Sequence, residues 1–338
     1  MNFYPVVRKL LFLLEPETAH TLSLKLMDVA HRLGLLRWIV GKPVKAPVTV
    51  MGIEFSNPIG LAAGLDKNGE HIDALAACGF GFVEIGTVTP RAQPGNPKPR
   101  LFRLEADEAI INRMGFNNKG VEYLLDNVKR SQRQCVLGIN IGKNRDTSLE
   151  NAVEDYRTAL SQVYPYADYI TINISSPNTP GLRELQHGEE LEKLLSGLKQ
   201  EQSCLEATYG KYVPLAVKIA PDLDDGAIAE LARTFIRLKI DGVIATNTTS
   251  SREDLRDQRY AQEQGGLSGR PLTVISNDVL EKLVAELDGK IPVIAAGGVF
   301  SAEDARRKME LGAALVQIYT GFIYQGPTLI RDCAGVSS

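Results

Sequence analysis

The sequence predicts an α/β protein built as a (β/α)8 TIM barrel that is preceded by an N-terminal amphipathic helical extension. From residue 58 onward, short runs of apolar and β-branched residues alternate with longer segments of helical periodicity, which is typical of parallel strands joined by helices. Eight runs in roughly 250 residues fit a closed barrel better than an open doubly wound sheet. The runs cover residues 58–65, 82–89, 136–142, 169–175, 214–220, 242–248, 292–299 and 314–320.

The N-terminal extension, residues 1–45, is predicted to form two helices separated at Glu15-Pro16. Each helix has one apolar face, and lysine and arginine outnumber acidic residues in this segment. A basic, amphipathic helical pair suits an anionic membrane surface, but a pair packed on the barrel would show the same pattern. We expect residues 46–338 to form the barrel domain. The apolar faces comprise Val6, Leu10 and Leu14 in the first helix, and Leu22, Leu26, Val29 or Ala30, and Leu33 in the second.

Composition excludes several classes of function. A net charge of −3 and a pI near 5.9 argue against a nucleic-acid partner, because phosphates demand a basic face. The four cysteines show neither a C-x-x-C pair nor a zinc spacing, so we expect reduced thiols and a cytosolic protein. No apolar stretch is long enough to span a membrane, and no secretion signal is predicted. No histidine and carboxylate cluster indicates a metal.

The active site of a (β/α)8 barrel lies at the carboxyl ends of its strands, and here every predicted strand ends in polar residues or glycine. Two segments, 90–119 and 251–269, are predicted to cover this end of the barrel. The strand ends carry Gly64, Thr87, Asn140, Asn173, Lys218, Thr246, Gly297 and Gly298, and Tyr319 with Thr320.

Several of these side chains suggest chemistry. Lys218 lies inside the apolar run LAVKIA, and a buried ammonium there would face an anion or an electron-rich ring. Lys67 follows the first strand and could equally be a solvated loop lysine. The glycines of AAGGV, after the seventh strand, favour a phosphorylated ligand.

Amide groups suit a ligand with alternating N–H and C=O edges, such as a flavin or a pyrimidine. Four asparagines are expected at the barrel mouth for this purpose: Asn112, Asn140, Asn173 and Asn247. The four histidines lie off the strand ends, and His31, His71 and His187 are predicted on the surface. Proton transfer is therefore assigned to Ser175, Ser176, Thr248 or the lysines.

A set of long motifs closely resembles dihydroorotate dehydrogenases of the quinone-dependent, membrane-associated class (class 2). The motifs include LAAGLDKNG, INRMGFNN, NISSPNTPGLR, PLAVKIAPD, GGLSGRPL and IAAGGVFSAEDA, and the N-terminal helical segment belongs to the pattern. The resemblance implies oxidation of (S)-dihydroorotate to orotate in de novo pyrimidine (UMP) biosynthesis. It also implies FMN as the hydride acceptor and a membrane quinone as the terminal electron acceptor.

The resemblance also implies roles for individual residues. Ser176 would be the catalytic base that removes the C5 proton. FMN would contact Ala63, Gly64, Leu65, Asp66, Lys67, Thr87, Asn140, Asn173, Lys218, Thr246, Gly269, Gly298, Tyr319 and Thr320. Dihydroorotate would contact Lys67, Asn112, Arg113, Met114, Gly115, Phe116, Asn173, Asn178, Asn247 and Thr248.

For the N-terminal helices, the resemblance implies a hydrophobic passage for quinone, with His20 and Arg103 as candidate polar contacts. It implies a peripheral monomer on the cytoplasmic side of the cell (inner) membrane. Ser176 separates the chain from the soluble class, which has cysteine as its base. Two other hypotheses are a flavin barrel acting on uridine in RNA and a non-redox phosphate-binding barrel. The first should carry a cysteine acid and a basic surface, and the second leaves Lys218 and the asparagines without a purpose.

Overall fold

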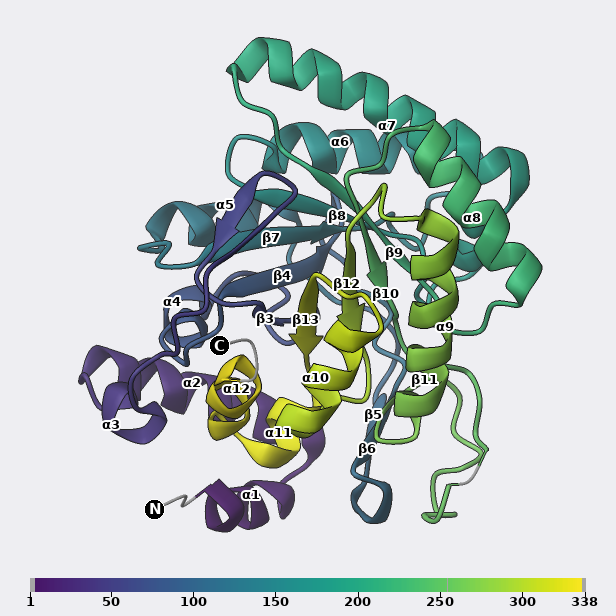
Figure 1. The fold of residues 1–338 in the computed structure, drawn as a ribbon. Helices are drawn as coiled ribbons and strands as arrows, with labels where there is room; N and C mark the ends of the chain where they lie inside the picture. The colour runs from purple at the N-terminus through teal and green to yellow at the C-terminus, as the bar shows by residue number, and fades with distance from the viewer. Residues whose placement is uncertain (1–3, 254, 336–338) are drawn as a thin grey trace.

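The computed structural model describes residues 4–253 and 255–335, and its centre is a closed barrel of eight parallel strands (Figure 1). Each predicted run contains one barrel strand, so the predicted fold class is confirmed. The strands are buried on both faces, which explains their continuous apolar sequences. They are β3 (Ile59–Leu61), β4 (Phe82–Val88), β7 (Val136–Ile141), β8 (Tyr169–Asn173), β9 (Leu215–Ile219), β10 (Gly242–Ala245), β12 (Val293–Ala296) and β13 (Leu315–Ile318), and β13 pairs with β3 to close the barrel.

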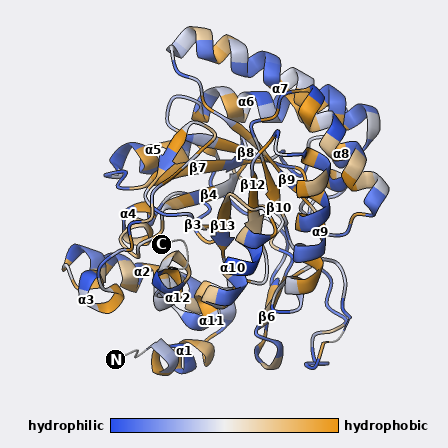
Figure 2. Ribbon diagram, in the orientation of Figure 1, coloured by the Kyte–Doolittle hydropathy of each residue, from blue (hydrophilic) through white to orange (hydrophobic). Residues whose placement is uncertain are grey.

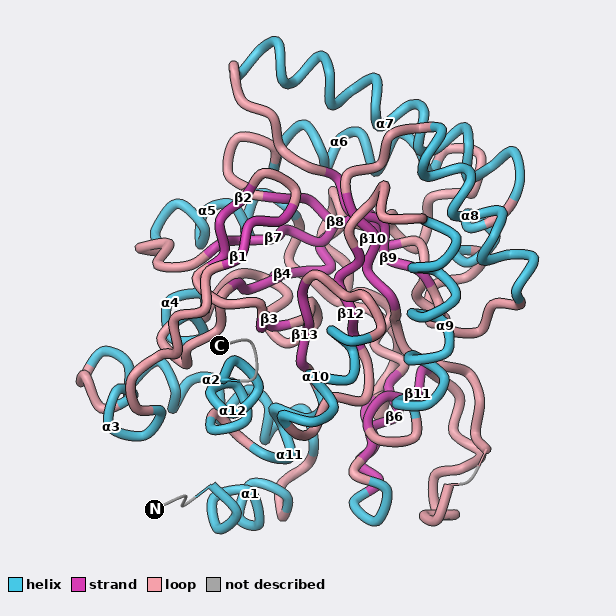
Figure 3. The backbone as a smooth tube through the Cα atoms, in the orientation of Figure 1, coloured by secondary structure: helices cyan, strands magenta, loops and turns pink. Residues whose placement is uncertain are grey.

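Helices surround the barrel and cover the outer faces of its strands (Figures 1 and 3). Their apolar faces pack inward and their polar faces meet solvent, as the colouring of Figure 2 shows. These helices are α4 (Ile72–Ala76), α5 (Val121–Arg130), α6 (Ala152–Val163), α7 (Gly188–Tyr209), α8 (Asp225–Arg237), α9 (Leu272–Leu287), α10 (Ala302–Glu310), α11 (Thr320–Gln325) and α12 (Thr328–Ala334), with a 3-10 turn, η2 (Leu182–Gln186), before α7.

A short hairpin, β1 (Val48–Val50) and β2 (Ile53–Phe55), closes the amino-terminal end of the barrel. Phe55 is fully buried there and meets Phe82 edge to face at 5.2 Å between ring centroids. Tyr169 and Ile244 belong to the same apolar cluster. This plug leaves the carboxyl end of the barrel for a ligand.

The two segments predicted to cover the carboxyl end pair with each other. Strands β5 (Leu101–Leu104) and β6 (Ala109–Asn112), joined by the 3-10 turn η1 (Glu105–Asp107), form an antiparallel sheet with β11 (Gly266–Gly269). The sheet lies at one side of the barrel mouth, below α9 in Figure 1. Parts of both segments therefore form an ordered sheet, where the sequence indicated only loops.

The N-terminal helices are α1 (Tyr4–Phe12), α2 (Pro16–Arg32) and the unpredicted α3 (Leu36–Val40). The predicted break is confirmed, because the Glu15 carboxylate caps α2 by accepting from the backbone N–H groups of Glu17 (3.1 Å) and Thr18 (2.9 Å). Leu13, directly after α1, is 82% exposed, and Trp38 on α3 is 77% exposed. Among the described residues, no helix has the length and hydropathy needed to cross a bilayer.

Polar contacts attach the N-terminal helices to the barrel domain. The Tyr4 hydroxyl donates to the Ile323 carbonyl at 2.6 Å, and the Arg8 guanidinium donates to the Tyr324 carbonyl at 2.8 Å. Arg100, from the segment before β5, donates to both carboxylate oxygens of Glu17 in α2, at 2.9 and 3.1 Å. The helices therefore rest on the carboxyl end of the barrel and the sheet beside it.

Candidate active site

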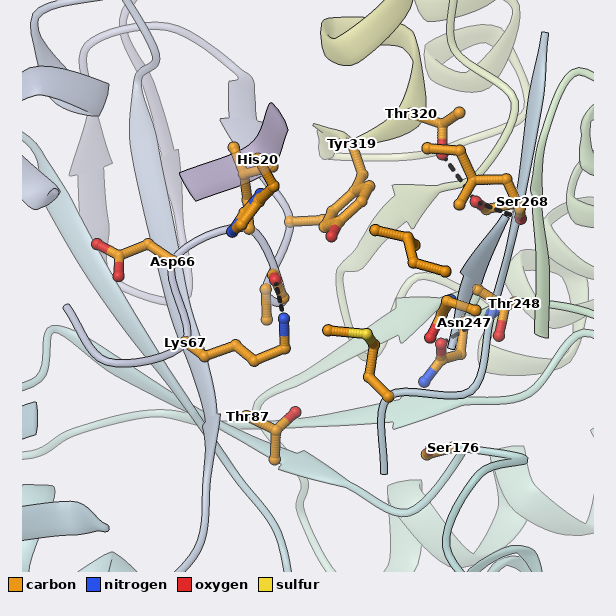
Figure 4. Close-up of a pocket in the computed structure, with 18 of the residues that line it drawn as sticks. His20, Asp66, Lys67, Thr87, Ser176, Asn247, Thr248, Ser268, Tyr319 and Thr320 are labelled. Carbon is orange, nitrogen blue, oxygen red and sulfur yellow. Dashed lines mark hydrogen bonds between the residues drawn. The ribbon is translucent and has the colours of Figure 1, made fainter. Parts of the chain in front are cut away.

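A cavity of about 670 Å³ opens at the carboxyl end of the barrel, between the strand ends, the β5-β6-β11 sheet and α2 (Figure 4). It is lined by every predicted site residue except Asn140 and Arg113. The eight strand ends therefore converge on one space, as the fold class predicted.

The two adjacent serines have different positions. Ser176 lines the cavity, and its hydroxyl oxygen accepts a hydrogen bond from the Asn178 backbone N–H at 3.2 Å. Ser175 is fully buried behind the wall, where its hydroxyl accepts from the Asn247 amide at 2.9 Å and donates to the Asn173 side-chain oxygen at 3.2 Å. Of the two serines among the candidates for proton transfer, only Ser176 faces the cavity.

Arg183 holds the loop that carries Ser176. Its guanidinium donates to the backbone carbonyls of Ser175 (3.2 Å) and Thr248 (3.0 Å) and pairs with Asp222 at 2.8 Å. It thereby ties the loop after β8 to the loop after β10. The sequence motif contains Arg183, but nothing in the sequence indicated these partners.

The predicted amides form a buried network at the cavity floor. The Thr87 hydroxyl donates to the Asn140 side-chain oxygen at 2.5 Å, and the Asn173 amide donates to both Thr87 (2.9 Å) and Asn140 (3.1 Å). Asn140 therefore supports the floor from below. Asn178 reaches across to the sheet, where its amide donates to the Asn112 backbone carbonyl at 3.1 Å.

A carboxylate that the sequence analysis missed lies below this floor. Glu84 is fully buried and accepts from Asn140 (2.8 Å), Tyr169 (2.8 Å) and Gln317 (2.6 Å). Side chains alternate between the two faces of a strand, and this alternation along β4 could have placed Glu84 inside the barrel. The hydrogen-bond partners of Glu84 lie on three other strands, however, so the sequence did not indicate them. Gln317 lines the cavity, and its side-chain amide oxygen is buried without a hydrogen-bond partner.

Lys218 is buried in the cavity wall, in register with Asn173 of β8. Burial lowers the pKa of its ammonium, and the Glu84 carboxylate opposes that shift. A partly desolvated cation of this kind attracts negative charge that develops on a ligand.

Lys67 lies across the cavity from Asn247 and Thr248 (Figure 4), and its ammonium donates to the Gly64 carbonyl at 2.7 Å. Burial, together with the Arg100 charge, lowers the pKa of Lys67 to about 8, while Glu17 and Asp66 oppose the shift. The neighbouring Asp66 carboxylate accepts from the backbone N–H groups of Glu70 (2.9 Å) and His71 (2.7 Å), and burial raises its pKa. Asp66 therefore shapes the loop that presents Lys67.

The glycine turn after β12 suits close approach of an anion. Gly297 and Gly298 both have positive φ, 110° and 72°. A Cβ on Gly298 would lie 2.2 Å from the Thr273 hydroxyl oxygen, so a side chain there is excluded. Across the cavity wall, the Thr320 hydroxyl donates to Ser268 at 2.8 Å (Figure 4). Ser268 is a further lining residue that the sequence analysis missed.

Helix α2 closes one side of the cavity with His20, whose ring faces Tyr319 in Figure 4. Burial and the charges of Lys67 and His71 lower the pKa of His20 to about 4, so its imidazole is neutral at physiological pH. The surface prediction for His71 was wrong, because His71 lines the cavity and its Nδ1 lies 2.7 Å from the Asp28 carboxylate.

Two arginines act outside the cavity. Arg103 donates to the Leu11 (3.3 Å) and Phe12 (3.1 Å) carbonyls, so it caps the carboxyl end of α1. Arg113 pairs with Glu263 and lies over the Phe102 ring at 4.7 Å, which directs its side chain into the sheet. Its neighbours Asn112, Met114 and Gly115 do line the cavity.

Comparisons with known proteins agree on one family. The sequence model of the family described as Dihydroorotate dehydrogenase matches residues 45–334. Proteins named dihydroorotate dehydrogenase (quinone) from Chromobacterium violaceum and Marinobacter nauticus are 60% and 56% identical, over 98% and 97% of this chain and 96% and 97% of their own lengths. A crystal structure of DHODH in complex with ferulenol from Eimeria tenella has a TM-score of 0.87 at 40% identity, covering 95% of this chain and 90% of that chain.

Proposed function

The chain belongs to the dihydroorotate dehydrogenase family, as a quinone-dependent member, and we propose that it oxidises (S)-dihydroorotate to orotate in this cavity with FMN as the hydride acceptor. The electrons then pass to a membrane quinone, and the reaction serves pyrimidine biosynthesis. The observation that carries the proposal is Ser176, a serine at the wall of a cavity that also holds two partly desolvated lysines.

The residues present fit FMN. The cavity volume of about 670 Å³ lies in the range of cofactor sites, and the glycine turn at Gly297 and Gly298 leaves room for a phosphate. The unpaired amide oxygen of Gln317 offers an acceptor to a ring N–H. Lys218 would face the polar edge of the ring and stabilise negative charge on it. FMN would supply the hydride acceptor.

Ser176 is proposed as the base that removes the C5 proton of dihydroorotate. A serine hydroxyl is a weak base, so it needs a site that stabilises the oxyanion form. The Asn178 backbone N–H, 3.2 Å from the Ser176 oxygen, is such a donor. The 6% exposure of Ser176 keeps most water from competing for this bond.

Dihydroorotate is proposed to bind between Ser176 and Lys67. The Lys67 ammonium would pair with the substrate carboxylate, because its side chain lines the cavity and extends toward the middle of it in Figure 4. Amide and hydroxyl groups from Asn112, Asn178, Asn247 and Thr248 would bind the ring edges, and the Met114 to Phe116 segment would cover the substrate.

The N-terminal helices are proposed to bind an anionic membrane and admit quinone. The supporting observations are the exposed apolar side chains of α1, α2 and α3 and the extension of the cavity to His20 and Leu24 of α2. Neutral His20 is proposed as the polar contact for quinone, with Arg103 holding α1 in place. We place the protein as a peripheral monomer on the cytoplasmic side of the inner membrane.

Anaerobic stopped-flow spectroscopy tests the proposal by following flavin absorbance on mixing with dihydroorotate and then with a quinone or fumarate. We expect bleaching by dihydroorotate and fast reoxidation by quinone alone. A flavin-loaded protein that dihydroorotate does not bleach would contradict the substrate assignment.

Ser176→Ala tests the base. We expect flavin reduction to slow by about 10²–10⁴-fold with FMN retained, because that is the range for loss of a general base. The matched control is Ser175→Ala, which should alter orotate affinity through Asn247 more than the rate of flavin reduction. Near-normal reduction in Ser176→Ala would remove Ser176 from the mechanism.

A further inference from the structure

A further buried lysine, Lys308, lies outside the cavity and has no role in the proposed reaction. Lys308, on α10, is fully buried, and its ammonium donates to the Ser276 hydroxyl at 3.0 Å and to the Asn277 side-chain oxygen at 2.9 Å. Both partners are neutral and belong to α9. Within the part of the chain that the structure describes, no carboxylate forms an ion pair with Lys308.

Asp304, the acid of α10 whose charge acts on Lys308, already has hydrogen-bond partners. The Asp304 carboxylate accepts from the Phe300 backbone N–H and the Ser301 hydroxyl, both at 2.9 Å, at the amino end of α10. Burial lowers the pKa of Lys308 to about 8, and the Asp304 charge opposes this only in part. A buried ammonium with neutral partners is unfavourable unless an anion compensates for it.

The contacts of Lys308 lead to the glycine turn of the cavity. The Ser276 hydroxyl lies 3.1 Å from the Gly297 carbonyl oxygen, to which it can donate while it accepts from Lys308. One turn earlier on α9, the Thr273 hydroxyl donates to the Gly298 carbonyl at 3.1 Å. The carbonyls of this turn are therefore drawn toward α9, and Gly297 and Gly298 line the cavity on the other side.

We propose that Lys308 is a positioning residue for the cofactor: its buried ammonium is the counter-charge of the FMN phosphate, and it holds the Gly297-Gly298 turn through Ser276. The inference rests on the proposed FMN site. The phosphate would occupy the cavity side of the turn, and Lys308 lies behind the turn, where water does not screen its charge.

The experiment compares FMN with riboflavin, which has the same ring but no phosphate. The full chain is stripped of flavin, and the dissociation constant of each flavin is measured by fluorescence quenching. The variants are Lys308→Met and Lys308→Gln, of which the second keeps a hydrogen-bond donor toward Ser276. The control is Lys282→Met on α9, because Lys282 is partly exposed and pairs with Asp225 and Asp278.

We expect both Lys308 variants to lose about tenfold or more in preference for FMN over riboflavin, with riboflavin affinity little changed. Coulomb's law gives an effect of this size for two unit charges on the order of 10 Å apart at an effective dielectric of about 20. Lys282→Met should match the wild type. A preference that is unchanged, or equal losses for both flavins, would overturn the inference, even if dihydroorotate still bleaches the flavin. A wild-type chain that binds neither flavin would overturn the flavin proposal as well.

Discussion

Arg100→Met tests how α2 is held over the cavity. Arg100 makes four hydrogen bonds: two to the Glu17 carboxylate at 2.9 and 3.1 Å, and one each to the carbonyls of Pro94 (2.7 Å) and Asn96 (2.9 Å). The Arg100 and Glu17 side chains are 8% and 13% exposed. Removing Arg100 therefore leaves the Glu17 carboxylate desolvated without its main partner.

Breaking a buried pair by removing one partner lowers the free energy of unfolding by about 3–5 kcal/mol. Lys98 lies 3.2 Å from Glu17 and can still pair with it, so we expect the lower end of that range, about 3 kcal/mol. The loss should be local, because Glu17 belongs to α2 and Arg100 to the segment before β5. We therefore also expect slower flavin reoxidation by quinone.

The assay combines urea unfolding with hydrogen exchange of residues 16–32 and the two stopped-flow half-reactions. Glu17→Gln is the matched control, since it removes the charge that Arg100 compensates, and the double variant should be no worse than Arg100→Met alone. Burial raises the pKa of Glu17, but Arg100 and Lys98 outweigh it and lower it below 4.5. The stabilisation is thus present above about pH 4.5 and lost as pH falls through the lowered pKa. If hydrogen exchange in α2 of the Arg100→Met variant is as slow as in the wild type, this reasoning is refuted.

Two further predictions concern the two ends of the cavity. Because burial lowers the pKa of Lys67 to about 8, its ammonium is present below that pH and lost above it. Orotate affinity, measured by flavin absorbance titration, should fall above pH 8, approaching about tenfold per pH unit. The Lys67→Met variant should bind orotate weakly, and its affinity should not change with pH across this range. Deletion of residues 1–45 should slow flavin reoxidation by quinone more than flavin reduction by dihydroorotate and should weaken sedimentation with anionic vesicles. Equal losses in both half-reactions would indicate a structural role for the helices.

Sequence reasoning was strongest where the signal is local. Each barrel strand is a short apolar run, and each ends in polar residues or glycine that the fold class brings to one mouth, so the eight strands and the lining that their ends supply followed from the chain alone. The break before α2 also followed, because a cap and a proline are local features. His71 was wrongly assigned to the surface, since its partner Asp28 lies on α2, which is distant in the sequence.

The sequence by itself therefore determined the barrel and the ring of strand ends, whereas the structure decided which of the two adjacent serines faces the cavity. The tertiary structure decided which buried polar and charged groups form hydrogen bonds or ion pairs with one another. Gln317 and Glu84 are 233 residues apart, Arg100 and Glu17 are 83 apart, and Lys308 and Ser276 are 32 apart. Such partners come into contact only when the barrel closes and the helices dock. The periodicity of apolar residues in the sequence does not indicate these contacts. Burial then sets the charge states of the lysines, because desolvation depends on what packs around a group and not on its neighbours in sequence.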